Sequence, residues 1–342
     1  FIPSAYYGFT DPLADLKDGI IILICYGAGL LWARLQPEGA DGVRMPATLA
    51  AGFTLFAALT TFANPMKVDG FLNPNRSAPN FWTGGEPLNG PVLGLYASLG
   101  LCLLPLVLLR SSDRRDPKGP GWLVAAFVLA ALGFISNLIM QNRSPYFALA
   151  ASFLACSAIF LQRQAGRPWK RPLHLLLRLS PLVIVFVLLM LRFPDFMSDI
   201  LFRRFGEQGV DTGGRTAAWV AVLQGLPAHP FGGKRIPIGG IPFANNLWVD
   251  VGYNSGVIAL MVLLAFHLAH LPFLNRLYRS RPPMLETLVV SAMGASMLVG
   301  CMGEPVLDAS ILYFGGTCFL LGWLKTRAGS AALSPTTSST RA

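Results

Sequence analysis

Nine apolar runs alternate with polar segments along the 342 residues of the chain. They cover residues 19–33, 47–63, 91–109, 121–140, 146–161, 173–191, 247–271, 284–301 and 306–324. An apolar stretch of about 20 residues matches the thickness of the hydrocarbon core when it forms a helix. The pattern therefore predicts an all-α polytopic membrane protein with about nine transmembrane helices.

The composition agrees with this class. Hydrophobic residues make up 53% of the chain and charged residues only 13%, whereas a soluble domain carries about 25% charged residues. The formal net charge of +10 is typical of basic cytoplasmic loops and does not favour nucleic acid as a partner. The five cysteines lie in or beside apolar runs without C-x-x-C spacing, so they predict small core or lipid-facing residues rather than a disulfide or zinc framework.

The runs indicate a single transmembrane domain over residues 1–325. Its longest polar segment, the large loop at 193–246, separates the sixth and seventh runs and is the part most expected to carry a site, because long loops tend to carry function. Residues 326–342 are rich in Ser, Thr and Ala and predict a disordered cytoplasmic tail.

Charge predicts which loops share a side of the membrane. The loops at 34–45, 110–118, 163–171 and 273–282, with the tail, hold most of the 27 Lys and Arg residues. By the positive-inside rule this set is cytoplasmic, whereas the large loop, the loop at 64–90 and the turn that carries Arg143 are external. Residues 1–17 then fall outside, and since no signal peptide is visible we expect a further N-terminal span to precede this sequence.

Two arginines on the external side are candidates for binding an anion. Arg143 lies in the tight junction QNRSP, and Arg215 lies in DTGGRTAAW, at the start of a helical stretch that Thr212 or the glycines would cap. A helix N-terminus beside a guanidinium suits a diphosphate. The alternatives are a snorkelling arginine at the junction and a surface arginine on an interfacial helix.

Other polar residues accompany them. Lys234 and Arg235 follow glycines in HPFGGKRIPIGG, and these glycines either bring backbone close to a ligand or simply connect elements. His229 is the one histidine of the large loop and is a candidate general base or a structural residue. The acids Asp250 and Glu304 lie near the membrane boundary, where ionisable residues suggest function. No metal-binding pattern occurs, so neither a metal nor another cofactor is expected.

Three segments together resemble the O-antigen ligase and O-antigen polymerase superfamily, bacterial enzymes that move lipid-linked glycans. DGFLNPNRSA (69–78) is similar to the family's Gly-Phe-x-Asn-Pro-Asn segment, and NRSPYFALAASF (142–153) to its Ser-Arg segment entering a helix. The third, GGRTAAWVAVLQGLPAHPFGG followed by ANNLWVDVGYNSGVIAL, is similar to its Arg…Trp…Pro-x-x-Gly loop and the His-Asn-x-x-Leu helix after it.

The resemblance implies roles for particular residues. Arg143 and Arg215 would bind the undecaprenyl diphosphate of the donor, and Asn246 matches the family's asparagine. The family's histidine, implied to be the base, falls on Asn245, which cannot take a proton at neutral pH. Either His229, Asp250 or Glu304 supplies the base, or the protein is an inactive member.

The expected protein is a metal-independent glycosyltransferase of the bacterial inner membrane, with its active face in the periplasm. It would move a glycan from undecaprenyl diphosphate to an acceptor such as a lipid A core, as a ligase does. A repeat-unit polymerase for O-antigen or exopolysaccharide is the alternative within this class. The alternative of another class is a transporter, a flippase or a non-catalytic member that binds lipid-linked glycan.

Overall fold

The computed structural model describes residues 12–36, 42–63, 77–79, 87–109, 120–140, 142, 144–163, 214–240, 243–279, 284–304, 306 and 310–333. Its helices are α2 (Pro12–Leu35), α3 (Arg44–Ala63), α4 (Gly90–Leu101), α5 (Leu104–Leu109), α6 (Pro120–Met140), α7 (Ser144–Arg163), α11 (Arg215–Gly225), α12 (Leu247–Arg279), α13 (Met284–Gly303) and α15 (Ile311–Leu333). A short antiparallel pair, β1 (Ser77–Pro79) and β2 (Pro87–Asn89), precedes α4, with Ala78 opposite Leu88.

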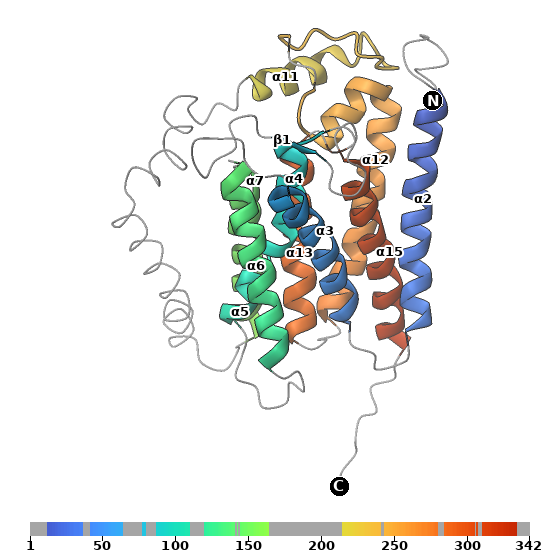
Figure 1. The fold of residues 1–342 in the computed structure, drawn as a ribbon. Helices are drawn as coiled ribbons and strands as arrows, with labels where there is room; N and C mark the ends of the chain where they lie inside the picture. Colours follow the sequence, from blue (N-terminus) through green and yellow to red (C-terminus); the bar gives the residue numbers. More distant parts are fainter. Residues whose placement is uncertain are drawn as a thin grey trace, which may run out of the picture.

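The prediction of an all-α polytopic membrane protein is confirmed. Seven of the described helical segments are long and apolar enough to cross a membrane, and they form one bundle (Figure 1). The sixth predicted run, 173–191, lies outside the described residues. Helix α15 carries Lys325 and Arg327 in its second half and is not among the seven.

The third predicted run is not one continuous helix. The chain breaks at Cys102 and Leu103, between α4 and α5. Pro105 has no N–H to give to the carbonyl of Leu101, and its ring clashes with the preceding turn, so the helix ends there. The tighter bond from Leu103 N to Gly100 O (3.0 Å) carries the chain into α5.

The ninth run also differs from its prediction. Helix α15 begins at Ile311 rather than at 306, and Ser310 Oγ accepts a bond from Tyr313 N (3.3 Å), as an N-cap serine does. The helix then continues to Leu333. The prediction of disorder is therefore wrong for residues 326–333, where the Ala-containing sequence extends the helix; residues 334–342 lie outside the described part.

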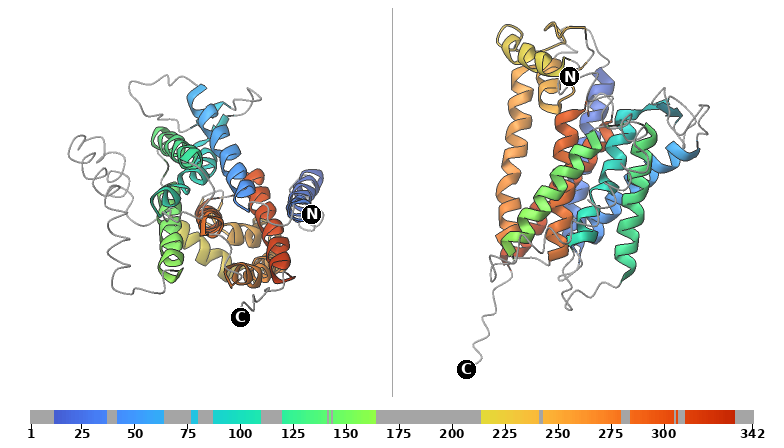
Figure 2. Two further views of the ribbon diagram at one scale, coloured as in Figure 1. Left: turned by 90° about the horizontal axis from the view of Figure 1, so that it is seen from below. Right: turned by 90° about the vertical axis from the view of Figure 1, so that its left-hand side faces the viewer.

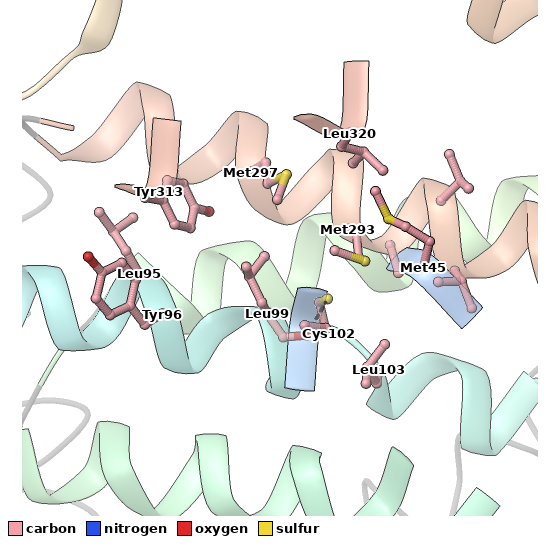
Figure 3. Close-up of a cluster of buried hydrophobic side chains, with 14 of the residues drawn as sticks. Met45, Leu95, Tyr96, Leu99, Cys102, Leu103, Met293, Met297, Tyr313 and Leu320 are labelled. Carbon is pink, nitrogen blue, oxygen red and sulfur yellow. Dashed lines mark hydrogen bonds between the residues drawn. The ribbon is translucent and has the colours of Figure 1, made fainter. Parts of the chain in front are cut away.

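The main core lies between α4, α13 and α15. Leu95, Leu99, Met293, Met297 and Tyr313 are all buried there and Figure 3 shows them interleaved. A few hydroxyls inside this core bond across helices, as Ser98 Oγ does with Ser296 Oγ (3.1 Å) and Ser310 Oγ with Tyr96 OH (2.8 Å). All five cysteines are free thiols and four are buried, which confirms their prediction as small core residues.

One end of the bundle gathers the segments that were predicted to share a membrane face. In Figure 1 the pair β1–β2, helix α11 and the junction of α6 with α7 lie at the same end as the start of α2, whereas α15 ends at the other. The alternation of helices that the apolar runs predict is sufficient to produce this gathering. We call this end the α11 end.

A buried ion pair closes the opposite end. Glu286, whose side chain is 2% exposed, accepts bonds from Arg327 Nε (3.0 Å) and Nη2 (3.2 Å). A Cβ on Gly42 would overlap the Glu286 carboxylate, so the pair also holds the chain before α3.

We expect Arg327→Gln to lower the free energy of unfolding by about 2 kcal/mol, because it leaves the Glu286 carboxylate buried without its bidentate partner. The loss is smaller than the 3–5 kcal/mol of fully buried pairs, since Arg327 is 23% exposed. Thermal unfolding in detergent measures the change. Lys325→Gln, at an exposed position two residues away, is the control, and an equal loss in both variants would contradict the role of the pair.

Candidate active site

Helix α12 is interrupted at Gly256, and its two parts lie side by side below α11 (Figure 1 and Figure 2, right). Gly256 has φ 85° and ψ −177°, outside the helical region. In a straight helix Trp248 and His267 would be about 28 Å apart along the axis, yet their ring centroids are 5.4 Å apart. Residues 247–255 therefore form a re-entrant helix that folds back against residues 257–279.

The prediction of one crossing over 247–271 is thus wrong at its start. Both parts are apolar, so hydrophobicity alone joins them, but only 257–279 crosses the bundle. The buried Leu247 belongs to the main core, which places the start of the re-entrant helix inside the bundle. Sequence reasoning missed this feature; its signals are Asn254-Ser255-Gly256, a turn-forming triplet within an apolar run, and Asn246 as a cap before Leu247.

The glycine-rich loop after α11 clamps the turn of the hairpin. The backbone bonds are Gly233 N to Asn254 O (2.9 Å), Lys234 N to Tyr253 O (3.1 Å) and Val257 N to Pro230 O (2.9 Å). A Cβ on Gly232 would lie 2.6 Å from Gly256 N. These glycines therefore allow two backbone segments of this chain, the loop after α11 and the turn at Gly256, to approach each other closely.

A carboxylate and an amide organise the start of the re-entrant helix. Asp250, 1% exposed, accepts Ala244 N at Oδ1 (2.7 Å) and Asn246 N at Oδ2 (3.0 Å). Asn246 Oδ1 caps the helix by accepting Trp248 N (3.1 Å) and Val249 N (3.2 Å). Both side chains thus hold the turn 244–246 in one conformation.

Asn245 is presented by that turn. Its φ is 56°, a left-handed conformation that asparagine tolerates better than most residues. Its Nδ2 donates to Phe243 O (3.2 Å), and the side chain is half-buried. Helix α11 holds the backbone of the preceding residue, Ala244, because Trp219 Nε1 donates to Ala244 O (2.6 Å).

Arg215 links α11 to the end of α13. Its Nη1 donates to Gly303 O (2.7 Å), one of the carbonyls that a helix leaves unbonded at its C-terminus. The neighbouring carbonyl of Met302 accepts Asn246 Nδ2 at the longer distance of 3.4 Å. The end of α13 therefore joins Arg215 to the turn that carries Asn245.

Among the described residues, no side chain caps the start of α11. Gly214 is the N-cap residue with φ 82°, which agrees with the prediction that a glycine caps this helix; Thr212 lies outside the described residues. The first bond within the helix runs from Ala218 N to Gly214 O (2.9 Å), so the N–H groups of residues 215–217 have no helical acceptor. Together with the helix dipole they form a positive end beside the Arg215 guanidinium.

Glu304 belongs to the same cluster. It follows Gly303 directly, is 5% exposed, and donates its backbone N–H to Gly300 O (3.1 Å). The structure thus brings four of the predicted residues to one region: Arg215, Asn245, Asp250 and Glu304.

The other predicted residues are placed differently. His229 lies in the turn after α11, with its N–H bonded to Gly225 O (3.0 Å). That is the opposite end of an 11-residue helix from Arg215, about 16 Å along the axis. Lys234 and Arg235 are exposed in the loop that clamps the hairpin, where Lys234 Nζ lies 5.4 Å from the Phe243 ring centroid.

Arg143 lies outside the described residues, but its neighbour Asn142 is buried. Asn142 Nδ2 donates to Gly90 O (2.5 Å) at the start of α4, and Gly94 leaves room for it, since a Cβ there would be 2.7 Å from Nδ2. This bond fixes the junction of α6 and α7 to the α11 end. Among the described residues no group of three or more His, Cys, Asp and Glu could hold a metal ion.

The arrangement defines a polytopic helical membrane protein with a polar cluster at one end of its bundle. No protein-family model and no curated protein matches the chain. Among solved structures, it is similar to a chain of a peptidoglycan synthase complex in which polymerization and crosslinking are coordinated, with 15% sequence identity and a TM-score of 0.50. The match covers 94% of this chain and 91% of that chain, so the likeness in fold extends over nearly the whole molecule.

Proposed function

We propose that the protein is a membrane glycosyltransferase that moves a glycan from undecaprenyl diphosphate to an acceptor hydroxyl, in the manner of an O-antigen ligase. The observation that carries the proposal is the meeting of Arg215, the uncapped start of α11 and the turn 244–246 at the end of α13. Arg215, the start of α11 and the turn 244–246 all lie in the third of the segments that resemble the O-antigen ligase and polymerase superfamily. The end of α13 lies outside those segments.

The donor side follows from charge. A diphosphate carries at least two negative charges, and a guanidinium can hold two of its oxygens at once. Arg215 uses one of its five N–H donors on Gly303 O, so its remaining donors and the N–H groups of residues 215–217 can meet a phosphate. Arg143, from the junction that Asn142 fixes, would bind the same group.

The reaction needs no covalent enzyme intermediate. The acceptor oxygen attacks C1 of the donor sugar, the bond from C1 to the phosphate oxygen breaks, and its electron pair leaves with undecaprenyl diphosphate. Arg215 and the helix dipole stabilise the charge that develops on that leaving group. No step requires a metal ion or another cofactor.

The acids take different parts in this proposal. Both oxygens of Asp250 accept backbone N–H groups, so a role in positioning Asn245 fits its contacts better than proton transfer. Glu304, adjacent to the carbonyl that Arg215 binds, would line the donor site. His229 and Arg235 lie away from this cluster and are assigned no catalytic part.

A repeat-unit polymerase is the second candidate, and the fold likeness to a chain of a peptidoglycan synthase complex favours it. The two activities differ only in the acceptor: a lipid A core for a ligase, and a second lipid-linked glycan for a polymerase. In either case the partners are a lipid-linked donor and membrane lipid, and the proposed location is the bacterial inner membrane with the α11 end in the periplasm.

The test is release of undecaprenyl diphosphate from a labelled lipid-linked oligosaccharide by the full chain in nanodiscs. We expect release to depend on the acceptor, and Arg143→Ala to lower it about 10²-fold, as loss of a donor to a developing oxyanion does. The matched control is Arg34→Ala. Arg34 is exposed in the last turn of α2, away from the α11 end.

The products distinguish the candidates. One addition to a lipid A core identifies a ligase, and a ladder formed from donor alone identifies a polymerase. If no acceptor supports release but proteoliposomes move the donor across the bilayer, the protein is a transporter and the proposal fails.

A further inference from the structure

The re-entrant helix brings an indole N–H and an imidazole together inside the bundle. Trp248 Nε1 is buried and has no hydrogen-bond partner among the described residues. The ring of His267 lies 5.4 Å away, centroid to centroid. A buried N–H without an acceptor is destabilising, because the group has given up its bond to water, so such a group calls for a bound acceptor.

The proton on His267 can be placed. Its Nδ1 lies 2.9 Å from Leu263 O, and since a carbonyl oxygen only accepts, Nδ1 carries the hydrogen in the neutral ring. Nε2 is then the acceptor nitrogen. Trp248 and His267 therefore offer one donor and one acceptor on adjacent rings, which is the combination that a hydroxyl group satisfies.

His270, about one turn further along α12, has no ring nitrogen left to accept a hydroxyl. Its Nδ1 is bonded to Phe266 O (2.7 Å) and its Nε2 to Tyr26 OH (3.1 Å). Both nitrogens are thus engaged, Nδ1 within α12 and Nε2 in the contact with α2. The difference between two histidines on one helix indicates that His267 is not simply part of the packing.

We propose that Trp248 and His267 bind the acceptor hydroxyl and that His267 is the general base of the transfer, an inference that rests on the proposed function. Trp248 follows Asn245 by three residues, and the helix that carries it is capped from the turn that presents Asn245. The hydroxyl oxygen accepts from Trp248 Nε1 and donates to His267 Nε2.

The step balances in atoms and charge. The hydroxyl proton moves to His267 Nε2 while the oxygen's electron pair forms the bond to C1 of the donor sugar. The bond from C1 to the diphosphate oxygen breaks, and its electron pair leaves with undecaprenyl diphosphate. The imidazolium then returns its proton to water.

Three titratable groups of the described α2, α15 and re-entrant helix have other hydrogen-bond partners. Tyr26 on α2 is bonded to His270, Tyr313 OH on α15 donates to Ser296 O (3.3 Å), and Asp250 on the re-entrant helix accepts two backbone N–H groups. The residue of α15 that faces His267 is Phe314, with ring centroids 6.3 Å apart.

Two substitutions test the inference on the full chain. We expect His267→Gln, which keeps an acceptor oxygen but takes no proton, to lower kcat about 10²-fold and to abolish the fall of rate toward acid pH that an imidazole base imposes. Trp248→Phe removes only the N–H and should raise the acceptor KM. His270→Gln is the control for loss of a neighbouring histidine, and thermal unfolding confirms that each variant folds.

A second readout does not depend on turnover. In protein labelled with ¹⁵N-histidine, the acceptor glycan alone should shift the resonance of His267 and not that of His270. If wild type releases undecaprenyl diphosphate but His267→Gln keeps its rate and its acid limb, or falls no further than His270→Gln, the inference is overturned. If wild type shows no release, the proposed function fails, and a missing shift then overturns the hydroxyl site as well.

Discussion

Replacing Arg215 by alanine should lower the rate of undecaprenyl diphosphate release about 10³-fold, near the upper end of the effect of a single oxyanion donor. The guanidinium stands at the positive end of α11 and is held by Gly303 O at 2.7 Å. In the proposed reaction, its removal takes away a charge that would stabilise the leaving group as the bond to C1 breaks. Rates measured with saturating donor separate this effect from weaker binding.

Two further variants sharpen this result. Arg215→Lys keeps the charge but loses the planar fork, so we expect an intermediate loss of about tenfold to 10²-fold. Arg235→Ala, in the exposed loop, should leave the rate within about twofold. If Arg215→Ala retains most of the wild-type rate while it stays folded, Arg215 serves only to cap α13.

Replacing Gly256 by valine should prevent the re-entrant hairpin from forming and cost more than about 4 kcal/mol of stability. A Cβ at this position would overlap Pro230 O, and φ is +85°, so a β-branched residue meets both a backbone clash and a strained conformation. Retention of the protein in detergent and its unfolding temperature measure the loss.

Gly239→Val separates the two causes of this loss of stability, the backbone clash and the strained conformation. Gly239 also has a positive φ, +68°, but nothing lies within 4 Å of its Cβ position. This variant should lose only the cost of the backbone conformation, about 1–3 kcal/mol. Equal losses at the two glycines would mean that close packing of Pro230 against the hairpin contributes nothing.

The sequence predicts the helices that single apolar runs encode. Helices α3, α6, α7 and α13 begin and end within a few residues of their runs, because run length sets span length when the flanking residues are polar. The run over 247–271 could not be resolved in this way, since no polar loop separates residues 247–255 from residues 257–271. The signals of a hairpin are local ones, Asn246 as a cap and the turn-forming triplet Asn254-Ser255-Gly256.

The site was predictable to a similar extent. Arg215 and its glycine cap follow from the motif DTGGRTAAW, as both express local helix chemistry. The bond from Arg215 to Gly303 joins residues 88 positions apart and depends on how α11 lies over α13. The adjacency of Trp248 to His267 depends in turn on the hairpin, so no spacing in the sequence could indicate it.

The bond between Arg215 and the end of α13 has a consequence for affinity. A free arginine side chain loses about 2 kcal/mol of rotamer entropy when it is fixed. Here that entropy is lost on folding, because Gly303 O already holds the guanidinium beside the start of α11. A ligand that meets this arginine therefore encounters a preorganised side chain, and variants that loosen the end of α13 should weaken binding without touching the ligand.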